Sequence, residues 1–385
     1  MTDLLAPSIY LGQVATLCWQ PNSSAGSGTA TWIMGRSTHY ARENIVNPTL
    51  IFANFYVPST NAETTIGAGT IKASIEYPAG TFTLCNEGEI SFPNGLTALT
   101  FTNVVIPYGA KFWVRALQKN SNGVIWINNG TGTAASGCGF EFGTGAATDK
   151  TATGTVAAST NSYYGPIAIL APTRRPSVLM HGDSRNSQGL DIVSDNSYDY
   201  GEALRSIGPS FGYTSLSTSG ASLSGYKNSH TYRQQLAQYY SHIWNAYGVN
   251  DMNGAGASAA QLAADQVIFN AYSEFTGKTI IGQTLTPFTT STDSFATTTN
   301  QTIQISDKIR TYNDLVRAGI TGQTFYFDVS DAVDPLRSGK WPVERSLVGS
   351  SGSAGFSTTD GLHGNKTIHA LIRDRGGINL NWIRR

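Results

Sequence analysis

The feature that most constrains the fold is a change in the pattern of apolar residues near residue 165. Before it, apolar and polar residues alternate in short runs at 71–77 and 111–117, and a third run at 47–58 is rich in strand-forming residues. Turn sequences such as Pro93-Asn94-Gly95 separate these runs, and helical periodicity is absent from this half. This half therefore predicts an all-β sandwich of jelly-roll type.

After a linker-like segment at 172–176, expected strands alternate with expected helices. One helix is expected from an N-cap at Ser258 to a stop at Gly277, and others before Gly319 and after Asn365. Such alternation predicts a parallel sheet covered on both faces, an α/β three-layer domain. The expected strands fall at 177–180, 213–216, 242–247, 279–281 and 324–329. With 385 residues, two domains are expected, at 1–170 and 171–385.

Charge is sparse and balanced, since charged residues make up 13% of the chain and the net charge is zero. A neutral chain without basic runs lacks the electrostatic signature of a nucleic-acid-binding protein. No apolar stretch approaches the length of a membrane span. The first residues have no basic start or long apolar core, so no signal peptide is expected. A surface rich in uncharged polar residues is typical of extracellular or virion-associated proteins, leaves a cytoplasmic location open and is compatible with a homo-oligomer.

The three cysteines, Cys18, Cys85 and Cys138, all lie in the N-terminal half and form no Cys-x-x-Cys pair. An odd count permits at most one disulfide, and small buried apolar side chains are the expectation. No cluster of histidine, cysteine and carboxylate residues has the spacing of metal ligands, so neither a metal nor another cofactor is expected.

Three expected strands in succession end in residues suited to acyl transfer. Ser184 follows the first strand, Gly220 the second and Asn250 the third, and Asp360 and His363 follow the last strand. The carboxyl ends of parallel strands meet at one edge of a sheet, where ligands bind. A serine hydroxyl needs a base to become a nucleophile, and a carboxylate three residues from a histidine can orient that base.

A tetrahedral intermediate also requires hydrogen-bond donors directed at its oxyanion. The backbone N–H groups of Ser184 and Gly220 and the side-chain amide of Asn250 are the candidates. A glycine at position 220 would let the backbone approach a substrate closely.

These segments resemble the four sequence blocks of the SGNH, or GDSL-like, hydrolase family. Gly-Asp-Ser at 182–184, the glycine at 220, Gly-Val-Asn-Asp at 248–251 and Asp-Gly-Leu-His at 360–363 match them in order, over roughly residues 176–385. The resemblance implies Ser184, Asp360 and His363 as the catalytic triad, with Ser184, Gly220 and Asn250 forming the oxyanion hole. One departure is Arg185, which stands where the family name has leucine.

Each block is weak evidence alone, because turns and helix caps use the same residues. Their joint occurrence at successive strand ends favours catalysis. The α/β-hydrolase fold shares this chain order but requires Gly-x-Ser-x-Gly, and Asn186 stands at the second glycine position. Asp183, Tyr247 and Trp341 are further candidates for substrate contact, with burial in the core as the alternative for the two aromatic residues.

The expected activity is hydrolysis of carboxylic esters through an acyl-serine intermediate. The attached β domain, the uncharged polar composition and the family resemblance favour a short acyl group, acetyl, on a carbohydrate. Two alternatives remain open: a lipase or thioesterase acting on longer acyl chains, and a catalytically silent binding or virion-surface module. The role of the β domain, in glycan binding, assembly or support, also remains open.

Overall fold

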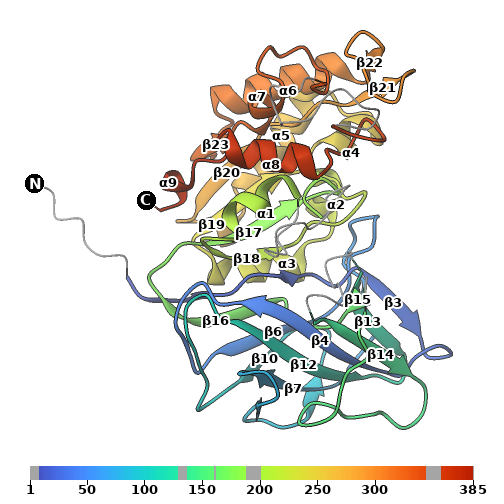
Figure 1. Cartoon of the computed structure of the whole chain (residues 1–385), viewed down its shortest axis with the longest axis vertical. Helices are drawn as coiled ribbons and strands as arrows, with labels where there is room; N and C mark the ends of the chain where they lie inside the picture. Colours follow the sequence, from blue (N-terminus) through green and yellow to red (C-terminus); the bar gives the residue numbers. More distant parts are fainter. Residues whose placement is uncertain (1–7, 129–136, 160–161, 188–200, 344–356, 385) are drawn as a thin grey trace, which may run out of the picture.

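The structure is a computed structural model that describes residues 8–128, 137–159, 162–187, 201–343 and 357–384. It combines helices with several β-sheets (Figure 1). The antiparallel sheets of the N-terminal half lie at one end of the molecule, and the helices and the parallel sheet of the C-terminal half lie at the other. None of the described helices is long and apolar enough to cross a membrane.

The N-terminal half contains two large antiparallel sheets. One has the order β1-β16-β6-β10, and the other has the order β14-β4-β12-β7-β8, with β9 also paired to β7. The strands of the first sheet are β1 (Tyr10–Gln13), β16 (Ala168–Thr173), β6 (Thr49–Asn54) and β10 (Gly95–Thr100). Those of the second are β14 (Gly139–Gly143), β4 (Trp32–Tyr40), β12 (Lys111–Lys119), β7 (Gly69–Glu76), β8 (Phe82–Leu84) and β9 (Ile90–Phe92).

Smaller sheets complete this half, and all three cysteines are buried and form no disulfide. The burial expected for the cysteines is therefore confirmed. The strands of these sheets are β5 (Ile45–Val46) with β11 (Val105–Ile106), and β3 (Ser23–Gly26), β13 (Gly123–Asn128) and β15 (Ser162–Tyr163).

The C-terminal half is built on a parallel sheet with the order β2-β18-β17-β19-β20-β23. Its strands are β2 (Cys18–Trp19), β18 (Gly212–Ser215), β17 (Ser177–Gly182), β19 (His242–Ala246), β20 (Thr279–Gln283) and β23 (Phe325–Phe327). The five expected strands are thus all present, within a residue or two of their expected bounds. Strand β2 comes from the N-terminal half and pairs with β18 through Thr214 and Ser215.

Helices cover both faces of this sheet, because alternate strand residues point to opposite sides. On one face, Leu179 and Ile243 pack in a cluster with α2 (Leu223–Asn228), α5 (Ala259–Asn270) and α6 (Ser306–Ala318). On the other face, Met180 and Trp244 pack in a cluster with α1 (Gly201–Ile207), α7 (Val329–Val333) and α8 (Lys366–Asp374). The remaining helical segments are α3 (Thr231–Gln235), η2 (Leu236–Tyr239), α4 (Val249–Asn253), η3 (Ser273–Phe275) and α9 (Leu380–Ile383), and a hairpin joins β21 (Thr289–Ser291) to β22 (Gln301–Ile303).

The expected helix boundaries are largely confirmed. Ser258 caps α5 by accepting a hydrogen bond from the N–H of Gln261, and Asn365 caps α8 in the same way. Helix α6 ends before Gly319, which has a φ of +91°. The stop expected at Gly277 is wrong for α5, because the chain turns to an extended conformation at Tyr272, after the helix ends at Asn270.

The first antiparallel sheet lies between two apolar clusters. Leu50 and Phe52 of β6 pack with residues of β7 and β12 in the second sheet. The alternate residues Ile51 and Ala53, together with Phe55, pack with α2, α5 and α6 in the C-terminal half. The two halves therefore share one continuous apolar contact, and the domain boundary near residue 170 stays a prediction.

Candidate active site

Ser184 follows the strand at which the order of the parallel sheet reverses. Strand β17 lies between β18 and β19, which are the next two C-terminal strands along the chain. In sheets of this topology the loops diverge on either side of such a strand and leave a crevice for a ligand. The serine therefore stands at the position where an open parallel sheet offers its binding site.

A tight turn holds Ser184 at the end of β17. The carbonyl of Asp183 accepts hydrogen bonds from the N–H groups of Asn186 (3.1 Å) and Ser187 (2.9 Å). The carboxylate of Asp183 accepts a further one from the N–H of Arg185 at 3.0 Å. Ser184 keeps 7% of its surface exposed, whereas Asp183 has none. Burial raises the pKa of Asp183, which the charge of Arg185 only partly offsets.

Ser184, His363 and Asp360 form one continuous chain of hydrogen bonds. The Oγ of Ser184 lies 2.7 Å from Nε2 of His363, and Nδ1 of the same ring lies 2.6 Å from Oδ2 of Asp360. The other carboxylate oxygen of Asp360 accepts the N–H groups of Leu362 and His363, each at 2.9 Å. Partial burial alone would raise the pKa of Asp360, but these hydrogen bonds hold it well below its usual value.

The loop that carries Asp360 and His363 is fixed by its backbone. The carbonyl of Gly361 accepts hydrogen bonds from Nε1 of Trp341 (2.8 Å) and from the N–H of Thr289 (2.9 Å). Gly361 has a φ of +77°, and a Cβ there would meet the carbonyl of Thr289. Only glycine fits this turn without a shift of the backbone.

Gly220 lies in the loop that follows β18, and Asn250 lies in α4, the helix that follows β19. Gly220 has a φ of +80°, which favours glycine. Nδ2 of Asn250 donates a hydrogen bond to the carbonyl of Ala221 at 2.8 Å, so the asparagine side chain is tied to the residue after Gly220. An amide nitrogen carries two hydrogens, which leaves one for a second acceptor.

Two of the three further candidates for substrate contact, Tyr247 and Trp341, lie fully buried in the core, and Asp183 is buried in the turn that holds Ser184. The indole N–H of Trp341 donates a hydrogen bond to the loop that carries Asp360 and His363, and the carboxylate of Asp183 accepts one within the turn that holds Ser184. None of the three presents a surface to a substrate, so the expected contacts are corrected to supporting positions.

Sequence reasoning missed Glu202, a carboxylate buried near the site. Its two oxygens accept hydrogen bonds from Nε2 of Gln283 (2.8 Å) and Oγ1 of Thr286 (2.7 Å). Burial raises its pKa to about 7, although the positive charge of Arg185 and the hydrogen bond from Thr286 act in the opposite direction. An acidic residue in the first turn of a helix is ordinary in a sequence, so no signal marked it.

Asp251 also serves a supporting role. Its carboxylate accepts the N–H groups of Leu223 and Ser224, each at 2.9 Å, at the start of α2. Helix α2 begins three residues after Gly220, so Asp251 ties α4, which follows β19, to the segment after β18. Burial raises the pKa of Asp251, and the backbone hydrogen bonds offset this only in part.

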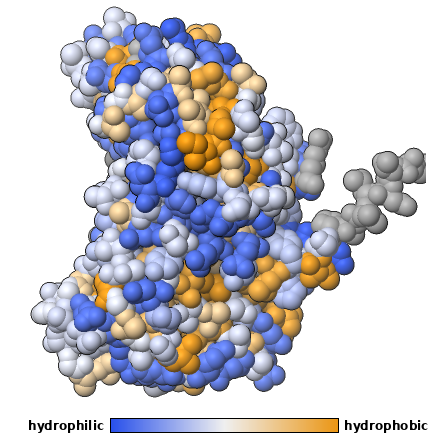
Figure 2. Space-filling view, turned by 180° about the vertical axis from the view of Figure 1, so that it is seen from behind, coloured by the Kyte–Doolittle hydropathy of each residue, from blue (hydrophilic) through white to orange (hydrophobic). Residues whose placement is uncertain are grey.

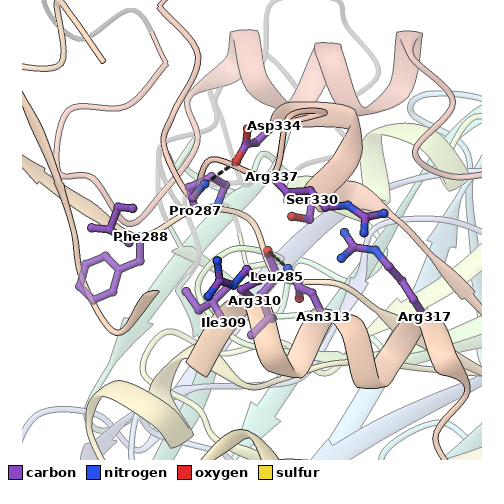
Figure 3. A pocket seen from close by; sticks show the side chains of 12 residues that line it. Leu285, Pro287, Phe288, Ile309, Arg310, Asn313, Arg317, Ser330, Asp334 and Arg337 are labelled. Carbon is purple, nitrogen blue, oxygen red and sulfur yellow. Dashed lines mark hydrogen bonds between the residues drawn. The ribbon is translucent and has the colours of Figure 1, made fainter. Parts of the chain in front are cut away.

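A small pocket of about 40 Å³ lies between the loop that follows β20 and helix α6 (Figure 3). Asn313 clamps this loop by exchanging hydrogen bonds with the N–H and carbonyl of Leu285, at 2.7 and 2.9 Å. The pocket has room for little more than one or two water molecules. Two of its lining residues, Arg317 and Arg337, form ion pairs with Asp331. Ser184, Asp360 and His363 are not among the lining residues.

No protein-family model matches the sequence, and no curated protein sequence matches it. Among solved structures, a family two carbohydrate esterase from Clostridium thermocellum in complex with cellohexaose is 12% identical, with 91% of each chain covered and a TM-score of 0.35. A member of the lipolytic protein G-D-S-L family from Veillonella parvula DSM 2008 is 15% identical, with 52% of this chain and 94% of that chain covered and a TM-score of 0.35.

An acetyl-xylooligosaccharide esterase from Geobacillus is 14% identical, with 52% of this chain and 91% of that chain covered and a TM-score of 0.34. Likeness at these TM-scores concerns the fold and does not identify a reaction or a substrate. The solved structures that this chain resembles are GDSL-type lipases and carbohydrate esterases.

Proposed function

We propose that this protein is a serine hydrolase of carboxylic esters. The observation that carries the proposal is the chain of hydrogen bonds from Ser184 through His363 to Asp360, at 2.7 and 2.6 Å. Ser184 is the nucleophile, His363 the general base and Asp360 the group that orients the imidazole and stabilises its charge. The low pKa of Asp360 supports this role, because the carboxylate keeps its negative charge throughout the physiological range.

In the first half of the reaction, Nε2 of His363 takes the proton of Ser184 as Oγ attacks the carbonyl carbon of the ester. The N–H groups of Ser184 and Gly220 and the remaining amide hydrogen of Asn250 stabilise the oxyanion. His363 then returns the proton to the leaving alcohol. In the second half, His363 activates a water molecule that hydrolyses the acyl-serine.

We propose a short acyl group, acetyl, on a carbohydrate as the substrate. Charged residues are only 13% of the chain, so much of its polar surface consists of groups that hydrogen-bond to hydroxyls without carrying charge. Figure 2 shows hydrophilic residues gathered across the middle of one face, between the C-terminal half and the N-terminal sheets. A chain with so few charges, whose polar groups are mainly hydroxyls and amides, suits an uncharged, hydroxyl-rich molecule better than a long acyl chain.

For the N-terminal half, we propose a β-sandwich that supports the C-terminal half. Residues of both large antiparallel sheets, such as Phe52 and Val114, pack in one cluster, which supports this architecture. Contacts of the first sheet with α2 and α5 support the structural role.

The experiment that tests the reaction is labelling with a fluorophosphonate, with Ser184→Ala as the control. The unsubstituted protein should be labelled at Ser184 and the variant should not. Failure of the unsubstituted protein to react would contradict the proposed enzyme and favour a silent binding module.

The experiment that tests the substrate compares p-nitrophenyl esters of rising chain length with a panel of acetylated oligosaccharides. We expect hydrolysis to peak at the acetyl ester and acetate to be released from the saccharides. A peak at long acyl chains, without acetate release, would favour a lipase or thioesterase instead.

A further inference from the structure

A loop of the N-terminal half lies directly against the oxyanion-hole glycine. The Cβ of Ser59 is 3.2 Å from the position that a Cβ on Gly220 would occupy, and its carbonyl oxygen is 3.4 Å from the same position. Two residues later, Nδ2 of Asn61 donates a hydrogen bond to the carbonyl of Ser222 at 2.6 Å. The loop around residues 58–63 therefore borders the segment that follows β18.

Buried polar contacts hold this loop in place. Nη1 of Arg233 donates to Oδ1 of Asn61 (2.7 Å), and Nη2 donates to its carbonyl (2.9 Å). Nε of the same arginine pairs with Glu63 at 3.2 Å, and Glu63 also accepts the N–H of Tyr232 at 2.9 Å. Ser59 itself is exposed to solvent beside Gly220, although the rest of its loop is held in place.

The proposed reaction gives the ester an orientation relative to the two faces of the sheet. His363 precedes α8, which packs on the face with α1 and α7, whereas Gly220 leads into α2 on the opposite face. The leaving oxygen must face His363 because that residue returns its proton. Because the oxyanion faces the N–H of Gly220, the acyl group takes the remaining position on the carbonyl carbon, beside the oxyanion and away from His363. Residues that contact Gly220, such as Ser59, are therefore the candidates to border the acyl group.

We propose that Ser59 is a specificity-determining residue that limits the size of the acyl group. This inference rests on the proposed esterase function and deepens it, because it assigns part of the acyl site to the N-terminal half. Ser59 is held in a fixed position because Arg233 binds Asn61 and Glu63 of the same loop. A small side chain at position 59 admits a short acyl group, and a larger one would narrow the site further.

The test measures kcat/KM for p-nitrophenyl acetate, butyrate and octanoate in Ser59→Gly and Ser59→Tyr. We expect Ser59→Gly to raise the butyrate-to-acetate ratio, and Ser59→Tyr to lower it by about tenfold, the selectivity typical of one or two methylenes in a confined pocket. The matched control is Ser91→Tyr, which places the same side chain at an exposed serine of β9 and should leave the ratio unchanged.

A second readout uses Ser59→Cys. The three native cysteines are buried, so the new thiol is the accessible one. Its thiol should react more slowly with a methanethiosulfonate reagent after Ser184 is labelled with a long-chain alkyl fluorophosphonate than after labelling with a short-chain one. Equal rates, or an unchanged ester ratio in both substituted proteins, would overturn the role of Ser59 while Ser184 still labels. Absence of labelling in the unsubstituted protein would overturn the esterase function and this inference together.

Discussion

Arg233 of the C-terminal half and Glu63 of the N-terminal half form an ion pair in which both side chains are almost completely buried. The arginine side chain is 0% exposed and the glutamate side chain 4% exposed, with Nε and Oε1 3.2 Å apart. The guanidinium also lies 4.7 Å from the ring centroid of Tyr226, and so forms a cation–π contact within the C-terminal half. One residue thus joins the two halves beside the candidate active site.

The first prediction concerns this pair. Arg233→Ala should lower the free energy of unfolding by about 3–5 kcal/mol, because it leaves the carboxylate of Glu63 buried without its partner. Chemical denaturation would measure the change. Arg310→Ala is the control, since its pair with Asp307 is 64% and 86% exposed and should contribute little. If the two substitutions lowered the free energy of unfolding by similar amounts, the proposed effect of burial on the Arg233–Glu63 pair would be wrong.

The second prediction concerns the orienting carboxylate. Asp360→Asn should reduce kcat by roughly 10³–10⁴-fold, because an amide favours the wrong tautomer of His363. KM should change much less, since Asp360 acts through the histidine and does not contact the substrate. Steady-state kinetics on p-nitrophenyl acetate would measure both constants. A fall in activity that arose entirely from KM would be inconsistent with this role.

The third prediction concerns pH and Glu202. Burial raises its folded-state pKa from an ordinary value near 4.5 to about 7, so the folded protein binds this proton more tightly than the unfolded chain. The stabilisation is complete below the ordinary pKa and is lost as pH rises towards 7. Unfolding titrations of the unsubstituted protein and Glu202→Gln should therefore diverge between these values, by on the order of 3 kcal/mol. Parallel pH profiles would contradict this assignment.

The fourth prediction concerns the dependence of the C-terminal half on the N-terminal half. A fragment of residues 171–385 lacks β2, the edge strand of the parallel sheet, and exposes the apolar cluster that packs against Ile51, Ala53 and Phe55. We expect this fragment to be insoluble or to unfold without a cooperative transition, whereas the full chain unfolds cooperatively. Circular dichroism melting of the two proteins would decide. A fragment that melts cooperatively and labels at Ser184 would contradict the prediction.

The sequence by itself determined the elements of the C-terminal half and the residues that meet in the candidate site. Short apolar runs between helical patterns located its five main strands, and caps such as Ser258 and Asn365 marked where helices begin. These signals depend only on residues close together in the chain, so a single sequence is enough to detect them. The order of the strand ends predicted that Ser184, Gly220 and Asn250 lie at one edge of the sheet, and the resemblance to SGNH hydrolases predicted His363 beside Ser184, where the structure places it.

Only the tertiary structure decided what surrounds that site. Burial of Tyr247 and Trp341, the raised pKa of Glu202 and the contact of Ser59 with Gly220 depend on chain segments that are far apart in the sequence. No local pattern shows that β2 completes the parallel sheet, or that Arg233 pairs with Glu63. Packing selects one set of such contacts among many that the same residue types would allow, so composition and periodicity do not specify them.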